Sequence, residues 1–127
     1  MLSDDEKQAL SKVRLEHAID CIEEAEKYRG ASNRSYYALF HAIRSVLALD
    51  GIDRKHHSGV ISEFRRLYIH TGIFDTEWSN IIGDQFDNRS ASDYNDFYTP
   101  AKEEVEEQVA SAKRFLTLTQ SYLQKRK

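Results

Sequence analysis

The sequence predicts an all-α protein, an up-and-down four-helix bundle with an additional short helix. Apolar residues recur at steps of three and four along most of the chain, and no stretch alternates for long with the period of two that marks a strand. The 127 residues include one proline and five glycines, which leaves room for long helices. The short connections between the predicted helices favour antiparallel neighbours. A chain of this length, 40% hydrophobic and 31% charged, predicts a single domain over residues 1–127.

The first helix is predicted over residues 4–28, with Ser3 or Asp4 as its N-cap. Its predicted core-facing stripe consists of Leu10, Val13, His17, Cys21, Ala25 and Tyr28. On this stripe we expect His17 to be half buried. Cys21 has no second cysteine to pair with, and we expect a buried thiol rather than a reactive one.

The second helix is predicted over residues 32–49, with Asp50 and Gly51 as its stop signal. Two apolar rows predict two core-facing sides: Tyr36, Phe40, Ile43 and Leu47, and beside them Leu39, Ala42, Val46 and Leu49. A third row carries two cations, an imidazole and a phenol: Arg34, Tyr37, His41 and Arg44. This row suits a phosphate or ribose ligand. Alternatively, His41 bonds a neighbouring helix and holds the bundle together.

Three further helices complete the predicted bundle. One covers residues 56–71, and the next runs from about residue 75 to residue 90 although it contains Gly83, a poor helix former. A polar and aromatic loop follows over residues 92–99. Thr99 then provides a capping hydroxyl before a proline, which is a strong start signal for the last helix.

Charge is distributed unevenly along the chain. Residues 27–66 contain eight Lys and Arg against three Asp and Glu, a net charge of +5 in a chain whose net charge is −3. This basic middle permits a local phosphate-binding surface, and equally fits helices with alternating solvated faces. No apolar run approaches the roughly 20 residues of a membrane span, and we do not expect the acidic N-terminus to be a signal peptide. We therefore expect a cytoplasmic protein that does not insert in a membrane.

The motifs of several cofactor and metal sites are missing from the sequence. It has no Walker loop, no glycine-rich dinucleotide fingerprint and no nucleophile elbow. Di-iron bundles need Glu-x-x-His motifs, whereas here only Asp53-x-x-His56 comes near, in a predicted loop. We expect neither a metal ion nor a cofactor.

The second helix also carries a family likeness. Residues 34–42 read Arg-Ser-Tyr-Tyr-Ala-Leu-Phe-His-Ala, which resembles the second helix of the HEPN family, small prokaryotic helical proteins often encoded beside a minimal nucleotidyltransferase. The likeness continues in the turn at residues 55–57, in residues 89–94 and at Phe115, and covers roughly residues 5–123. The resemblance implies an α-helical bundle that forms a homodimer.

Many HEPN proteins are metal-independent endoribonucleases with an Arg-x(4–6)-His motif near the start of a late helix. In this motif the arginine would hold the scissile phosphate and the histidine would move protons. Arg34 and His41 fit the spacing but lie in the second helix. Arg89 has the family's late position, but Asp93 and Tyr94 stand where the histidine is expected. Because tyrosine is a poor base at neutral pH, this departure argues against the usual ribonuclease activity.

The resemblance leads to one main functional hypothesis and two alternatives. The main hypothesis is a protein that acts with a minimal nucleotidyltransferase in a toxin–antitoxin or related RNA or nucleotide system. Its predicted phosphate-binding residues are Arg34, Tyr37, His41, Arg44 and Arg89, of which Arg34, His41 and Arg89 are the catalytic candidates. Tyr94 and Tyr98 are candidates for adenylylation by the partner, or else pack on the end of the bundle. The alternatives are an active ribonuclease with its cleft across a dimer, and a scaffolding bundle without a ligand.

Overall fold

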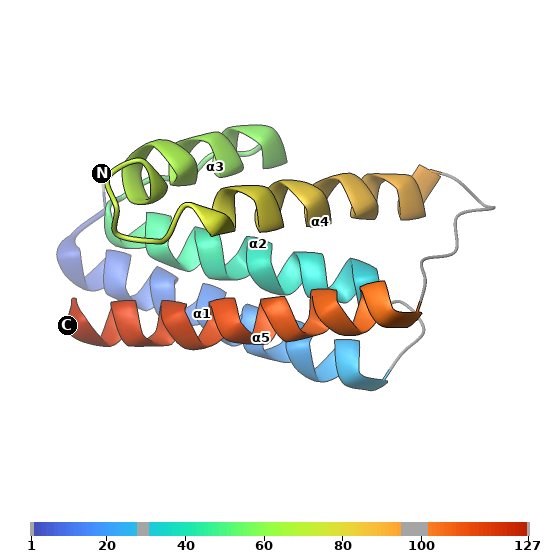
Figure 1. Ribbon diagram of the computed structural model, residues 1–127. Coiled ribbons are helices and arrows are strands. Elements are labelled where there is room, and N and C mark those ends of the chain that lie inside the picture. Colours follow the sequence, from blue (N-terminus) through green and yellow to red (C-terminus); the bar gives the residue numbers. More distant parts are fainter. Residues whose placement is uncertain (1, 28–30, 95–101, 127) are drawn as a thin grey trace.

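The computed structural model describes residues 2–27, 31–94 and 102–126, and over these residues it is an all-α bundle without a strand (Figure 1). The elements in chain order are α1 (Asp4–Lys27), α2 (Ala31–Leu49), α3 (His57–Phe64), the π-helical segment η1 (Arg65–Ile69), α4 (Glu77–Tyr94) and α5 (Lys102–Lys125). The predicted fold class is confirmed. None of the helices, over the described residues, is both long and apolar enough to cross a membrane.

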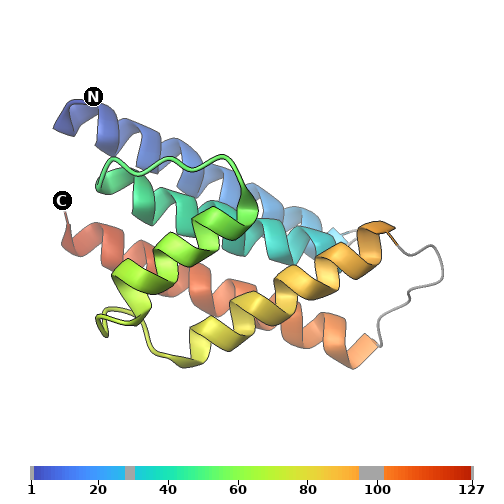
Figure 2. The ribbon, with the colours of Figure 1, turned by 90° about the horizontal axis from the view of Figure 1, so that it is seen from above.

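Helix α2 is the central element of the bundle. It contacts α1, α3, α4 and α5, and 14 of its 19 residues are buried. Helices α3 and α4 cover one side of α2, while α1 and α5 pack on the other side (Figures 1 and 2). All eight residues of the two apolar rows predicted for this helix are buried, so both predicted core-facing sides are confirmed.

The aromatic core lies where α3, α4 and α5 converge. The ring of Phe115, on α5, is fully buried and lies 5.0 Å from Trp78, 5.5 Å from Phe74 and 5.8 Å from Phe64, measured between ring centroids. Ring pairs at these separations add to the stabilisation that comes from buried area. This cluster fixes α5 against the two helices that precede it.

Local signals set the ends of α1 and α2. At the start of α1, the Glu6 amide donates to the Ser3 hydroxyl and the Ser3 amide donates to the Glu6 carboxylate, a reciprocal capping box. At the end of α2, Gly51 has φ 73°, and the amides of Gly51 and Ile52 bond the carbonyls of Ala48 and Leu47. Glycine adopts this left-handed conformation without a steric penalty. The predicted capping by Ser3 and the stop at Gly51 are confirmed.

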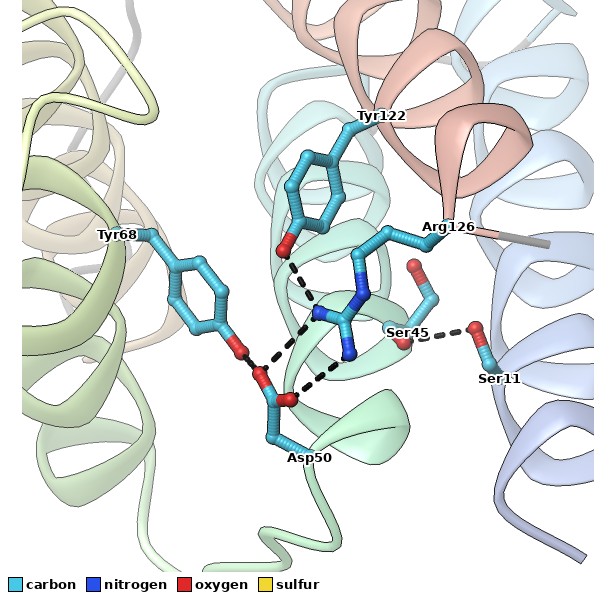
Figure 3. Close-up of polar contacts among 6 residues, drawn as sticks. All are labelled: Ser11, Ser45, Asp50, Tyr68, Tyr122 and Arg126. Atoms are coloured by element: carbon cyan, nitrogen blue, oxygen red, sulfur yellow. Dashed lines mark hydrogen bonds and ion pairs between the residues drawn. The ribbon is translucent and has the colours of Figure 1, made fainter. Parts of the chain in front are cut away.

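The buried face of α1 differs from the predicted stripe. Val13 is 46% exposed and His17 is exposed, although Cys21 is buried as expected. Ser11 and Arg14 face inward instead. These polar residues are tolerated there because both have partners on neighbouring elements, for example the Ser11 hydroxyl, which donates to the carbonyl of Ser45 at 2.8 Å (Figure 3).

The third and fourth predicted helices also differ in detail. The helix predicted over 56–71 is α-helical only to Phe64 and then widens into η1. Helix α4 continues to Tyr94, beyond the predicted end at residue 90, so that residues 92–94 are helical rather than part of a loop. Gly83 does not interrupt α4. A β-carbon there would lie 2.8 Å from Nη2 of Arg65, so the missing side chain makes room for this guanidinium.

A polar network closes the end of the bundle where α2 and α5 finish (Figure 3). The hydroxyl of Tyr68, in η1, donates to the carboxylate of Asp50, which directly follows α2. Arg126 donates to the same carboxylate, with Nη2 2.9 Å from Oδ1, and to the hydroxyl of Tyr122 at 2.8 Å. One carboxylate thus ties η1 and the C-terminal end of the chain to α2.

Candidate functional site

One side of α2 remains accessible after the helix has been packed on four neighbours. The five residues of α2 that are not buried are Asn33, Arg34, Tyr37, His41 and Arg44. We call them the α2 strip. From Asn33 to Arg44, at 1.5 Å per residue, the strip is about 17 Å long, which is longer than a single phosphate group. The structure thus places all four predicted row residues along the same partly exposed side.

Aromatic rings line the first half of the strip. His57, the first residue of α3, stacks on Phe40 with 4.0 Å between ring centroids and an interplanar angle of 9°. Its Nδ1 lies 2.7 Å from the Tyr36 hydroxyl, and its ring meets that of Tyr37 edge-on at 5.9 Å. His57 therefore packs against the ring of Tyr37 from the α3 side, and this tyrosine is half buried.

His41 occupies the middle of the strip and is half buried. Its Nδ1 is buried and has no hydrogen-bond partner among the described residues, so this atom does not tie the ring to a neighbouring helix. Burial, followed by the positive charges of His17, Arg44, Arg14 and His57, lowers the pKa of His41 from 6.5 to about 4. The imidazole is consequently neutral at physiological pH.

A shared carboxylate lies at the far end of the strip. Oδ1 of Asp53, in the segment between α2 and α3, lies 3.1 Å from Nη2 of Arg44 and 3.1 Å from Nη2 of Arg14 on α1. Burial opposes ionisation of Asp53, but the hydrogen bonds and charges of the two arginines outweigh it, and the pKa of Asp53 is lowered. The cluster of two arginines and one carboxylate carries a net charge of +1.

Of the two remaining arginine candidates, the structure describes the side chain of Arg34 but not that of Arg89. Arg34 is exposed and lies two helical turns before His41 on the same side of α2. The backbone of Arg89 lies in α4 one turn beyond Phe86, whose ring is 5.7 Å from that of Tyr36. The side chain of Arg89 lies outside the described part of the structure, so its place in the strip remains a prediction.

Of the two tyrosines proposed for modification, only Tyr94 has a described backbone, and neither has a described side chain. Tyr94 is the last residue of α4, a helical position rather than the predicted loop position, and its side chain is outside the described part. Tyr98 lies outside the described residues altogether. Their proposed modification stays a prediction.

The structure offers no metal-binding cluster among the residues it describes: no group of three or more His, Cys, Asp or Glu side chains converges there. In Asp53-x-x-His56, the carboxylate of Asp53 pairs with two arginines. A cation at Asp53 would compete with two guanidinium groups already in place.

The roles of three residues beside the strip, Arg14, Asp53 and His57, are not visible in the sequence pattern. The predicted stripe on α1 was rotated by about one position, which put Arg14 on the solvent side. An arginine among the inward residues of a helix signals a partner elsewhere in the fold, and this partner, Asp53, lies 39 residues further along the chain. No local pattern connects the two.

Comparison with known proteins agrees with this architecture. The family model of the HEPN domain matches residues 9–122. The chain is 29% identical over 117 residues to a UPF0332 protein of Thermotoga maritima, covering 87% of this chain and 89% of that protein. Two proteins of Methanocaldococcus jannaschii named as putative toxins are 32% and 31% identical, over 78% and 88% of this chain and 67% and 84% of their own lengths. The chain therefore belongs to the HEPN domain family.

Proposed function

We propose that this protein is a toxin-type HEPN protein that binds single-stranded RNA along the α2 strip. The observation that carries the proposal is that the single accessible side of the central helix bears two arginines, a tyrosine and a neutral histidine. The family match and the relatives named as putative toxins support the toxin part of the proposal.

The strip combines the two interactions that proteins use for single-stranded nucleic acids. Arg34 and Arg44 would bind backbone phosphates, since a planar guanidinium pairs well with phosphate oxygens. Tyr37 would stack on a base, an interaction worth about 1–3 kcal/mol per base in other proteins. The neutral ring of His41 would hydrogen-bond a ribose hydroxyl without adding charge.

The proposal includes two partners that follow from the family resemblance. The protein would act as a homodimer, and a minimal nucleotidyltransferase would bind it and control its effect on the host. Co-expression with any minimal nucleotidyltransferase encoded beside it tests this part. A stable complex is expected at micromolar concentration, and two proteins that elute separately at that concentration would contradict it.

Ribonuclease activity is the second candidate, because Arg34 and His41 share one side of α2 with the six-residue spacing of an Arg-x(4–6)-His motif. The lowered pKa of His41 weighs against it, since an imidazole of pKa about 4 is a weak base and carries no proton to donate at neutral pH. A bound phosphate would raise that pKa through its negative charge. Incubation with RNA in EDTA, with His41→Ala as control, separates cleavage from binding.

Fluorescence anisotropy with a short labelled single-stranded RNA tests RNA binding itself. Arg34→Ala should weaken binding about tenfold, and Tyr37→Leu should weaken it by a similar factor through the lost stacking. Arg114→Ala is the matched control, because Arg114 is an exposed arginine on α5. Equal affinity of the wild type, Arg34→Ala and Arg114→Ala would refute the strip as the RNA site.

A further inference from the structure

In the ion-pair cluster at the end of the α2 strip, the carboxylate is more exposed to solvent than the two arginines that it bridges. The side chain of Arg14 is only 8% exposed and that of Arg44 is 27% exposed, whereas Asp53, which bridges them, is 61% exposed. The carboxylate therefore covers a buried guanidinium from the solvent side. If Asp53 moved outward, the position of its Oδ1 would become empty. An anionic oxygen placed there could bond Nη2 of both Arg14 and Arg44.

A second carboxylate among the described residues also bridges two arginines, but both of those arginines are exposed. Glu63 lies 2.9 Å from Nη2 of Arg66 and 3.8 Å from Nη2 of Arg54, but these two arginines are 63% and 57% exposed. Water solvates both guanidinium groups there, and an exposed pair of this kind contributes little. Only the pair at Asp53 includes a buried arginine.

The surroundings of Arg14 favour an anion. Its Nη1 donates to the main-chain carbonyl of Arg44 at 3.4 Å, so the guanidinium is held in place from the α2 side. The nearby ring of His41 provides no negative charge. A guanidinium that is both buried and fixed in orientation loses little entropy when it binds an oxyanion, and the interaction is stronger than in water.

We propose that Arg14 and Arg44 form a binding site for a phosphate group, and that Asp53 is an internal competitor that fills this site until a phosphate displaces it. The ligand class is a phosphate oxyanion, from an RNA phosphodiester or from free phosphate. Displacement changes no covalent bond: one oxyanion replaces another between the same two guanidinium groups. The inference rests on the proposed function, since it extends the α2 strip onto α1 through Arg14.

The experiment uses inorganic phosphate as the probe and thermal unfolding as the readout, at constant ionic strength. A ligand that binds the folded state raises the unfolding temperature with concentration. In Asp53→Ala the phosphate affinity should rise at least tenfold over the wild type. Glu63→Ala removes the same charge from the other bridge and should leave the affinity within about twofold of the wild type.

Two further variants keep the test decisive. Arg14→Met combined with Asp53→Ala should return the affinity to that of the wild type, because the buried guanidinium is gone. Asp53→Asn retains the size of the side chain and serves if Asp53→Ala does not fold, with a gain in the same direction. An equal gain in Glu63→Ala, or a gain that persists without Arg14, would overturn the proposal.

A second arm identifies the source of the phosphate and separates this inference from the proposed function. The same variants are titrated with a short RNA that has no terminal phosphate. A gain for either probe in Asp53→Ala supports the site and names its source, whereas no gain for both probes overturns it. The proposed function instead fails on Arg34→Ala in the wild-type background, a result that leaves the phosphate gain in Asp53→Ala unaffected.

Discussion

The imidazole rings of His17, on α1, and His41, on α2, meet edge to face with 5.5 Å between their centroids. His17 is exposed while His41 is half buried, so water screens the two rings unequally. The protonated form of His41 is disfavoured because its ring has lost hydration and because positive groups surround it. This relationship connects the packing of α1 on α2 with the charge state of the candidate site.

The first prediction concerns stability as a function of pH. Because the pKa of His41 is about 4 in the folded protein and 6.5 without the fold, the unfolded chain takes up this proton first as the pH falls. The contribution of His41 to stability is complete above pH 6.5 and is lost as the pH falls from 6.5 to about 4. Urea unfolding of the wild type and of His41→Gln at several pH values measures it.

The variant His41→Gln cannot titrate and therefore serves as the reference for all other groups. The free energy of unfolding of the wild type minus that of the variant should fall steadily as the pH decreases from 6.5 to about 4. A difference that stays constant from pH 6.5 to 4 would show that His41 titrates normally. Imidazole NMR signals of His41 give the same pKa independently.

The second prediction concerns the close approach of Gly83 and Arg65. Alanine is better than glycine in a helix interior by about 1 kcal/mol. In the wild type, Gly83→Ala should gain much less, because the new methyl group would displace Arg65 from the carbonyl of Ser79, to which its Nη2 donates at 2.8 Å. In an Arg65→Ala background the full gain of about 1 kcal/mol should appear. Identical effects of Gly83→Ala in both backgrounds would disprove the contact.

The third prediction concerns the network around Asp50. Tyr68 is buried and donates to the carboxylate, so Tyr68→Phe should lower the free energy of unfolding by about 1–2 kcal/mol. Tyr122 instead accepts from Arg126 in an exposed pair, so Tyr122→Phe is the matched control and should cost less than about 1 kcal/mol. Chemical denaturation compares them, and a costlier Tyr122→Phe would reverse the assignment.

The fourth prediction concerns the salt dependence of RNA binding. Each phosphate contact with a single strand contributes about −0.7 to the slope of log affinity against log salt concentration. Arg34→Ala should therefore make the slope shallower by about 0.7, whereas Tyr37→Leu should weaken binding without changing the slope. Anisotropy titrations at four salt concentrations provide both numbers. A slope that does not change in Arg34→Ala would mean that Arg34 makes no phosphate contact.

The sequence was a good guide wherever structure is determined locally. The bounds of α2 agree within one residue, because apolar periodicity is strong in this helix and Gly51 provides the left-handed residue that ends it. The row from Arg34 to Arg44 was likewise predicted, since residues at steps of three and four share one side of a helix. These features depend on contacts within a few residues of chain.

The sequence was a poor guide wherever a distant partner determines the structure. Arg14 faces inward because Asp53 and a main-chain carbonyl of α2 satisfy it, and neither partner is visible in the pattern of α1. Gly83 argued against a continuous α4, yet the helix needs a glycine where Arg65 approaches. The sequence predicts His57 only as part of the helix over residues 56–71, whereas its stacking on Phe40 follows from the packing of α3 on α2.

The most direct test of the RNA site is a titration of the ¹⁵N-labelled protein with a short single-stranded RNA, followed by amide NMR. If RNA binds along the α2 strip, the largest shifts are expected at the residues of the strip and at His57, with small changes on the exposed side of α5 around Arg114. Large shifts on α5 with an unperturbed strip, or no shifts at saturating RNA, would contradict it.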